Sequence, residues 1–195
     1  MGIDKSNGYE SHASTFFRCR SKGAGGVGAQ SVRNWARTLP EEATVLDIGC
    51  GAGDPVSKAL MDEGLAVYGI DASPSLVQMF RQNFPGTPVA CEAVEDSAFF
   101  NRQFDAIIAW GLMFLLPKET QELVIPKMAN ALYPGGKLLF TAPSQKMKWN
   151  DAITEMESAS LGAEGYKTLL EALGLSLVDE FEDEGGNHYY HAVKL

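Results

Sequence analysis

The sequence predicts an α/β fold, a doubly wound sheet with helices on both faces, and three observations indicate it. Residues 45–60, VLDIGCGAGDPVSKAL, read as an apolar strand, a glycine-rich turn and the start of a helix. Residues 104–110, FDAIIAW, form a continuous apolar run typical of a parallel strand buried on both faces. Near the end of the chain, two strand patterns flank Gly185-Gly186, which predicts a hairpin whose last strand runs antiparallel to its neighbours.

The chain before the first strand has a different character. Residues 9–20 mix aromatic and basic side chains with little core-forming periodicity. Residues 23–28, GAGGVG, match the dinucleotide pattern G-x-G-x-x-G, but no strand pattern runs into them, so a flexible hinge is predicted there. Val32, Trp35 and Leu39 then follow helical spacing, which predicts an amphipathic helix that packs on the sheet and ends at Pro40.

Residues with strong positional preferences predict where the following helices begin and end. Asp54 is a good N-cap and Pro55 suits the first helical position, while Gly64 is predicted to end that helix and Ser73 to cap the next. The remaining strands are predicted at 66–70, 88–93, 104–110, within 132–143, at 175–181 and at 187–195. The remaining helices are predicted after 73, at 118–132 and at 163–173. Pro126 is predicted to kink the helix at 118–132. In a doubly wound fold of this kind, the loop after the fifth strand often shapes the substrate pocket, so the polar stretch 144–160 is expected to do so here.

The composition is that of one ordinary globular domain. The chain has 195 residues and a net charge of −9, which disfavours nucleic acid as a partner and favours a small molecule. No apolar run is long enough to span a membrane, and the polar start is no signal peptide. The three cysteines form neither a C-x-x-C pair nor a zinc set, so no metal is expected and a reducing cytoplasm is the predicted location. The protein is expected to be a monomer or a homodimer.

The glycine turn carries the most specific signal. Its glycines let a ligand approach the backbone closely, and the helix that follows points unpaired N–H groups the same way. The spacing is Asp47-x-Gly49-x-Gly51-x-Gly53, with an acid two residues before the first glycine. This resembles motif I of the class I S-adenosylmethionine-dependent methyltransferases, whose cofactor carries an ammonium and a sulfonium. An acidic turn suits such a ligand and would repel a pyrophosphate.

The resemblance extends from Val32 to Leu195 and implies a complete fold. It implies a Rossmann-like sheet of seven strands in the order 3-2-1-4-5-7-6, with residues 1–28 as a helical lid and hinge and residues 29–195 as the core of a single domain. Residues 132–143, LYPGGKLLFTAP, closely resemble motif VI of the family. The chain is most similar to the small bacterial enzymes related to quinone C-methyltransferases and to tellurite-resistance methyltransferases.

The resemblance also implies a set of residues that hold S-adenosyl-L-methionine or its product S-adenosyl-L-homocysteine. Asp71 follows Asp47 at close to the expected offset of about 20 residues, where an acid can bind the ribose hydroxyls. Arg18 or Arg20 in the lid is placed to meet the carboxylate of the cofactor. The other predicted cofactor residues are Tyr9, Gly49, Cys50, Gly51, Gly53, Pro55, Ala72, Ser73, Ala109 and Trp110.

Two registers remain open for the adenine contacts after the third strand. In the family, an acid takes the exocyclic amine and a backbone N–H donates to the ring. Glu92 can stand at the first acid, or Ala93 can stand there with Val94 giving the N–H and Glu95 nearby. Both registers are kept as predictions.

Catalysis leaves a weak signature, because methyl transfer from a sulfonium depends mainly on positioning. The segment after residue 109 resembles motif IV but lacks the Asn/Asp-Pro-Pro-aromatic run of nucleobase-amine methyltransferases. Trp110 is expected at the ligand edge, and His188, His12 and Tyr9 are candidates to receive a proton from the acceptor.

The predicted function is transfer of a methyl group from S-adenosylmethionine to a small-molecule acceptor by in-line displacement. Two alternatives remain: an NAD-dependent oxidoreductase, which the glycine spacing disfavours, and a non-catalytic module that binds S-adenosylmethionine.

Overall fold

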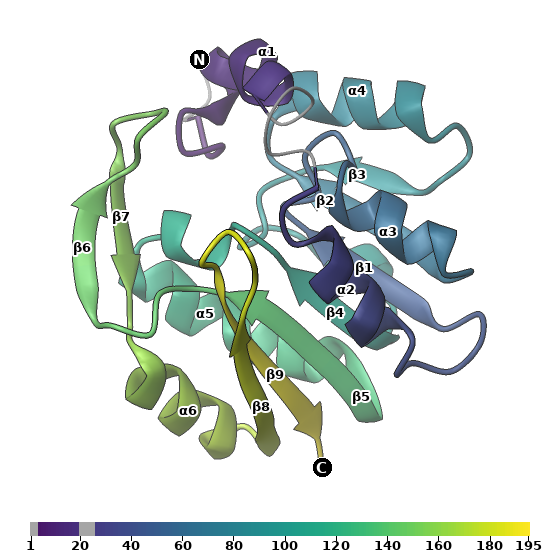
Figure 1. Ribbon diagram of the computed structural model, residues 1–195, viewed down its shortest axis with the longest axis vertical. Helices are drawn as coiled ribbons and strands as arrows, with labels where there is room; N and C mark the ends of the chain where they lie inside the picture. The colour runs from purple at the N-terminus through teal and green to yellow at the C-terminus, as the bar shows by residue number, and fades with distance from the viewer. Residues whose placement is uncertain (1–3, 20–25) are drawn as a thin grey trace.

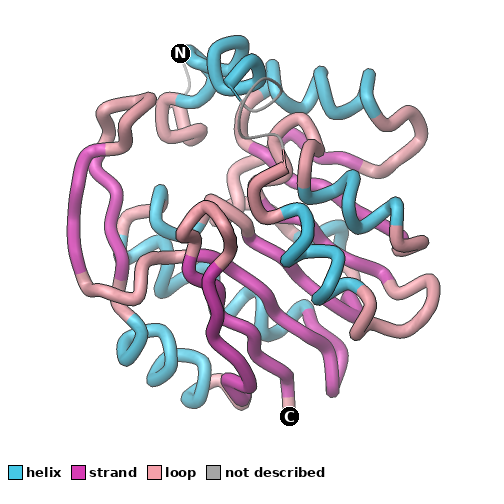
Figure 2. Tube along the Cα trace, viewed as in Figure 1, coloured by secondary structure: helices cyan, strands magenta, loops and turns pink. Residues whose placement is uncertain are grey.

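The computed structural model describes residues 4–19 and 26–195, and it is built around one seven-stranded sheet with helices on both faces (Figures 1 and 2). The strand order is β3-β2-β1-β4-β5-β9-β8, which confirms the predicted fold class and order, since β8 and β9 are the sixth and seventh strands of this sheet. The sheet consists of β1 (Thr44–Ile48), β2 (Ala66–Asp71), β3 (Val89–Cys91), β4 (Phe104–Ala109), β5 (Leu132–Thr141), β8 (Leu175–Glu182) and β9 (His188–Lys194).

Parallel pairing places the ends of the central strands at one edge. Ile48 of β1 lies opposite Ile70 of β2, and Asp47 lies opposite Ile108 of β4. The turns that follow β1, β2 and β4 therefore meet at the same edge, as expected for parallel strands. β9 runs antiparallel between β5 and β8, which confirms the predicted hairpin.

Helices cover both faces of the sheet and bury two apolar layers. The helices are α1 (Tyr9–Cys19), α2 (Ala29–Ala36), α3 (Val56–Asp62), α4 (Pro74–Asn83), α5 (Lys118–Ala131) and α6 (Ala163–Ala172), with short 3₁₀ turns η2 (Phe99–Asn101) and η3 (Met113–Leu115). α2 and α3 pack on one face through residues such as Trp35 and Leu60. α5 and α6 pack on the other face through residues such as Met128 and Tyr166.

The stretch 144–160 forms an element that its polar sequence did not predict. It is a second, two-stranded sheet made of β6 (Met147–Asn150) and β7 (Glu157–Ser160). Buried Gln121 of α5 holds it, because the side-chain amide donates to the carbonyl oxygens of Leu116 at 2.8 Å and of Ala159 at 2.9 Å. In Figure 1 this hairpin stands at the left of the sheet edge, with α1 between it and α4.

Several predicted boundaries shift by a few residues. α2 begins at Ala29, three residues earlier than the spacing predicted, after Gly28 at a φ of 80°. The N-cap of α3 is Pro55 rather than Asp54, and the structure places Asp54 in the turn at the wall of a cavity. Ser73 caps α4 as predicted, since its hydroxyl accepts a hydrogen bond from the backbone N–H of Leu76.

Candidate functional site

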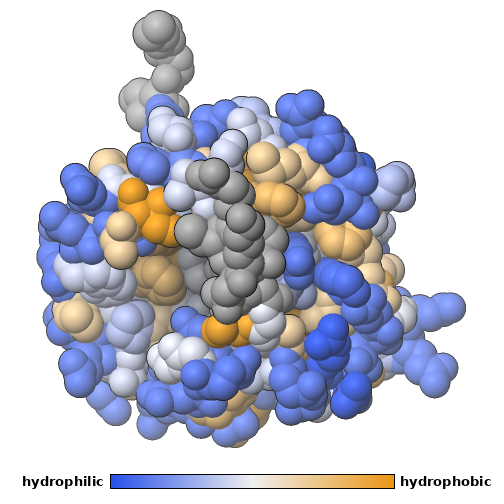
Figure 3. All heavy atoms as spheres, turned by 45° about the horizontal axis from the view of Figure 1, so that its top comes forward, coloured by the Kyte–Doolittle hydropathy of each residue, from blue (hydrophilic) through white to orange (hydrophobic). Residues whose placement is uncertain are grey.

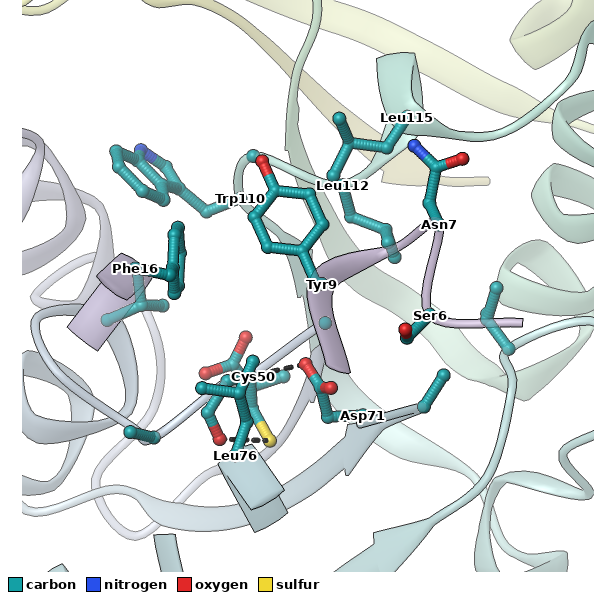
Figure 4. A pocket seen from close by; sticks show the side chains of 18 of the residues that line it. Ser6, Asn7, Tyr9, Phe16, Cys50, Asp71, Leu76, Trp110, Leu112 and Leu115 are labelled. Atoms are coloured by element: carbon teal, nitrogen blue, oxygen red, sulfur yellow. Dashed lines mark hydrogen bonds between the residues drawn. The ribbon is translucent and has the colours of Figure 1, made fainter. Parts of the chain in front are cut away.

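A cavity of about 370 Å³ lies at the edge where β1, β2 and β4 end, beside α1. Ligands bind at this edge in open α/β sheets. Figure 4 shows Asp71 and Cys50 on one side of it, and Tyr9, Phe16 and Trp110 on the other. Figure 3 turns this edge forward and shows apolar side chains at several places on this face, among hydrophilic ones.

The glycine turn after β1 is fixed to the end of β2. The backbone N–H groups of Gly49 and Cys50 both donate to the carbonyl oxygen of Ile70, at 2.8 and 3.0 Å. The backbone N–H of Gly51 donates to Oδ2 of Asp71 at 2.9 Å. Gly51 has a φ of 54°, and a Cβ added there would have its nearest contact at 3.8 Å, the ring of Phe16. The turn thus presents bare backbone to the cavity and to α1.

Asp47 lies on β1 beneath this turn and is only 1% exposed. The hydroxyl of Ser57, in α3, donates to its Oδ2. Burial raises the pKa of Asp47 to about 7, the charge of Asp71 adds to this rise, and the hydrogen bond from Ser57 opposes it. Asp47 therefore changes charge near neutral pH at the wall of the cavity.

Asp71 ends β2 and organises two turns. Its Oδ1 accepts the backbone N–H of Ser73 at 2.8 Å, while its Oδ2 accepts that of Gly51. Burial raises the pKa of Asp71, and these two hydrogen bonds oppose the rise. Each carboxylate oxygen has two lone pairs, so both can still accept a hydrogen bond from a ligand.

α1 is attached over the cavity by polar contacts. The carboxylate of Glu10 accepts hydrogen bonds from the hydroxyls of Ser73 and Ser75 and from the backbone N–H of Ser75 at 3.1 Å. These bonds, led by that of Ser73, lower the pKa of Glu10. The hydroxyl of Tyr9 donates to Oδ2 of Asp151 at 3.3 Å. The helix therefore bridges the start of α4 and the β6–β7 hairpin.

Trp110 follows β4 and is held by the C-terminal hairpin. Its indole N–H donates to the hydroxyl of Tyr189 at 2.6 Å, and Tyr189 donates to Oδ2 of Asp183 at 2.9 Å. A Cβ on Gly28 would lie 2.7 Å from the indole nitrogen, so only glycine fits there. The orientation of the indole at the cavity wall is thus set by residues distant in sequence.

The structure brings part of the predicted site together. The predicted residues at the cavity wall are Tyr9, Asp47, Gly49, Cys50, Gly51, Pro55, Asp71, Ala72, Val94 and Trp110. The predicted residues outside the wall are Gly53, Ser73, Glu92, Ala93, Glu95, Ala109 and His188. Arg20 and the side chain of Arg18 lie outside the described part of the chain.

The histidines named as proton acceptors face elsewhere. His188 is on β9 with its ring turned toward β8, where Nε2 lies 3.1 Å from a carboxylate oxygen of Glu180 and Nδ1 lies 3.7 Å from one of Glu182. Nδ1 of His12 lies 3.0 Å from the carbonyl oxygen of Gly8, one turn earlier in the chain. Neither ring lines the cavity.

The acids of the loop after β3 are bound by protein side chains. Glu92 accepts a hydrogen bond from the hydroxyl of Ser97 at 2.6 Å. Glu95 forms an ion pair with Lys5 at 3.3 Å. Of the four residues considered for the adenine contacts, only Val94 lines the cavity. Ala109, at the end of β4, is buried in the core.

Gly53 serves helix packing. It has a φ of 89°, and a Cβ added there would lie 2.3 Å from the ring of Phe84. We expect Gly53→Ala to lower the free energy of unfolding by about 1–3 kcal/mol more than Gly64→Ala, because overpacking carries that cost. Gly64, at a φ of 82° in open space, shares the backbone strain and lacks the clash. Denaturant titration measures both, and equal losses would contradict this packing role.

Several cavity residues were missed by sequence reasoning. Leu112, Phe114 and Leu115 follow Trp110 in the loop after β4, and Asp151 comes from the β6–β7 hairpin. The first three could have been found, because residues after a buried parallel strand lie at the ligand edge. Among the described residues, no cluster of His, Cys, Asp and Glu could hold a metal ion. No helix in that same part of the chain has the length and apolarity needed to cross a bilayer.

Comparisons with known proteins identify relatives in sequence. The methyltransferase domain family matches residues 45–136. The ubiquinone biosynthesis O-methyltransferase of Xanthomonas axonopodis pv. citri is 34% identical over 111 residues, which cover 54% of this chain and 45% of that protein. The putative methyltransferase YqeM of Bacillus subtilis is 30% identical over 112 residues, which cover 55% of this chain and 45% of that protein. The chain thus spans about half the length of the curated relatives it matches.

Solved structures share the fold over nearly the whole chain. A TehB-like SAM-dependent methyltransferase from Corynebacterium glutamicum superposes with a TM-score of 0.74 at 22% identity, covering 94% of this chain and 98% of that one. The magnesium protoporphyrin IX methyltransferase of Synechocystis, with bound SAH, gives a TM-score of 0.76 at 18% identity, covering 99% of this chain and 100% of that one.

Proposed function

Because this chain belongs to the class I S-adenosylmethionine-dependent methyltransferases, we propose that it transfers a methyl group from S-adenosylmethionine to a small-molecule acceptor. One observation carries the proposal: the acidic glycine turn and the apolar residues after β4 line the same cavity, beside α1. A site for a cationic nucleoside and a site for an apolar acceptor are thus adjacent.

The residues of the cavity fit the cofactor. Gly49 and Gly51 offer bare backbone, and Asp47 and Asp71 offer carboxylates to a ligand that carries an ammonium, a sulfonium and ribose hydroxyls. Leu76 of α4 and Val94 of the loop after β3 supply apolar surface for a flat base. The position of Val94 supports the register in which its backbone meets the adenine.

The chain's own contribution is orientation and exclusion of water. When bound, the cofactor supplies a methyl group on a good leaving group. The glycine turn, Asp47 and Asp71 fix one reactant, and the apolar wall around Trp110 fixes the other. Orientation of this kind is worth about 7 to 11 kcal/mol of barrier. α1 contributes Tyr9, Phe16 and Phe17 to the cavity wall and thereby keeps water from the reacting atoms.

The acceptor is proposed to be a small, largely apolar molecule. Phe16, Trp110, Leu112 and Phe114 line that side of the cavity. The net charge of −9 supports a small molecule over nucleic acid. Several relatives are named for small-molecule chemistry, in ubiquinone biosynthesis and on magnesium protoporphyrin IX. The free thiols of Cys50 and Cys91 support a reducing cytoplasm as the location.

Calorimetric titration and turnover together test this function. We expect S-adenosylmethionine and S-adenosylhomocysteine to bind with one site per chain and NAD not to bind. We also expect label from the methyl group of S-adenosylmethionine to appear in an acceptor from a panel of phenols, quinols, thiols and halides. Tight NAD binding would favour an oxidoreductase. Cofactor binding with no transfer to any acceptor would favour a non-catalytic binding module.

A further inference from the structure

Asp151 is a carboxylate at the cavity wall that lies outside the seven-stranded sheet and the turns that follow its strands. It follows β6, at the tip of the β6–β7 hairpin, and its side chain lines the cavity. The other described carboxylates at the wall come from the sheet edge: Asp47 lies on β1, Asp54 lies in the turn after β1, and Asp71 ends β2. Asp151 is therefore the described carboxylate that faces the cavity from the hairpin.

The carboxylate of Asp151 is held in one orientation. Its Oδ1 accepts the backbone N–H groups of Ile153 and Thr154, each at 2.9 Å, and the hydroxyl of Thr154 at 3.2 Å. Its Oδ2 accepts the hydroxyl of Tyr9 at 3.3 Å. One oxygen is thus committed to the hairpin, while the other faces the lid helix. An oxygen with two lone pairs can accept a second donor beside Tyr9.

Apolar residues line the same cavity as Asp151, and packing and hydrogen bonds support the segments that carry them. Ile153 of the same tip and Phe114 of the loop after β4 line the cavity with it. The ring of Trp149, in β6, packs on Phe114 with 5.7 Å between ring centres. Gln121 ties β7 to the loop after β4. The hairpin tip is therefore fixed against the acceptor side of the cavity.

We propose that Asp151 is the catalytic base for an acceptor that carries a hydroxyl group on an apolar ring. This rests on the proposed methyl transfer. Oδ2 accepts the hydroxyl proton, so the acceptor O–H bond breaks and an O–H bond forms on Asp151. The electron pair left on the acceptor oxygen forms the new O–CH₃ bond, and the sulfur–carbon bond breaks with its pair returning to sulfur. Asp151 then releases the proton to water.

The choice of a neutral hydroxyl follows from charge and surface. Aromatic rings at the wall, those of Phe16, Trp110 and Phe114, suit a flat apolar body. A fixed carboxylate favours a hydrogen-bond donor and repels an anion. An acceptor that arrives with its hydroxyl protonated is therefore selected, and Asp151 removes the proton only as the bond to carbon forms.

Binding of para-nitrophenol tests the proposal without turnover. Its hydroxyl ionises near neutral pH, and the two forms differ in absorbance. With S-adenosylhomocysteine present, wild-type protein is expected to bind the neutral form at least about tenfold more tightly than the phenolate, since like charges repel. Asp151→Asn should remove that preference. Asn keeps an oxygen for the N–H groups of Ile153 and Thr154, and a melting curve checks that it folds.

Glu155→Gln is the matched control. Glu155 is an exposed acid of the same tip and lies outside the cavity wall, so its variant should keep the wild-type preference. Absence of para-nitrophenol binding to wild-type protein, or an equal loss of both forms in Asp151→Asn, would overturn the proposal. Failure of S-adenosylhomocysteine to bind is a different result and would count against the proposed function itself.

Rates of phenol methylation provide a second test of Asp151 as the base. Asp151→Asn should slow methylation of weakly acidic phenols by about 10²- to 10⁴-fold, the usual contribution of a general base. Phenols that are already ionised at the assay pH need no base and should lose far less. Raising the pH should rescue the variant on weakly acidic phenols. A uniform loss across all phenols would show that Asp151 only supports the hairpin and would refute the proposed role.

Discussion

Deletion of residues 1–22 is expected to abolish methyl transfer and to weaken binding of S-adenosylmethionine, with only a small fall in melting temperature. Tyr9, Phe16 and Phe17 form part of the cavity wall, so their removal opens the site to water. The two apolar cores on the faces of the sheet include none of the described residues 4–19, so the fold should persist. Calorimetry, labelled turnover and a melting curve give the three readings.

Point variants separate the attachment of α1 to the start of α4 from the mere presence of α1. Glu10→Ala removes the hydrogen-bond acceptor for Ser73 and Ser75. Like the deletion of residues 1–22, it should weaken cofactor binding. Ser11→Ala, on the exposed side of α1, should behave as wild type. Hydrogen exchange in residues 9–19 should slow when cofactor is added. A truncated protein that turns over like the full chain would show that the site is built without the lid.

Binding of S-adenosylmethionine is expected to tighten as the pH rises from 5 to 7, by up to about tenfold per unit, and then to level off. The cationic cofactor binds the ionised form of Asp47, whose pKa in the unliganded protein is about 7. The α-carboxyl and α-amino groups of the cofactor keep their charges in this window. Asp71 and Cys50 face the same turn, and burial raises the pKa of both.

Two variants test whether ionisation of Asp47 causes the pH dependence of S-adenosylmethionine binding. Asp47→Asn should give weak and nearly pH-independent binding between pH 5 and 7. Ser57→Ala removes the hydrogen bond that lowers the pKa of Asp47, so the rise in affinity should move to higher pH. Without ligand, folded Asp47 holds a proton between pH 4 and 7 that the unfolded chain has released. The wild type should therefore lose stability relative to Asp47→Asn as the pH rises through this range. An unchanged pH profile in Asp47→Asn would assign the dependence to another group.

Local sequence carried most of the information about the sheet. The strand, glycine turn and helix from Val45 to Leu60 are specified by neighbours in the chain, and so is the cap at Ser73. The local strand patterns also predicted that Asp47 and Asp71 lie at the ends of strands, and these strands are adjacent in the sheet. Parallel pairing then brings those ends together without further information.

Contacts between distant segments could not be predicted in the same way. Gly53 matched the glycine spacing of a binding turn, yet its neighbour is Phe84, which reaches it only in the folded chain. His188 lies at the start of β9, beside the carboxyl end of β5, but its ring faces Glu180 on β8 and does not line the cavity. Asp151 had one local signal, Thr154 three residues later, which is typical of an Asx turn. That signal indicates a turn, and the expected pocket role of the stretch 144–160 did not single out Asp151.

The place of β9 in the sheet has a consequence for biosynthesis. This strand pairs with β5 on one side and β8 on the other, so it fills an interior position although it is made after every other strand. Until residue 194 has left the ribosome, β5 exposes an unpaired edge and Tyr189 is not available to orient Trp110. Exposed strand edges of this kind invite aggregation. We therefore expect nascent chains that stop before β9 to depend on chaperones and to bind no cofactor.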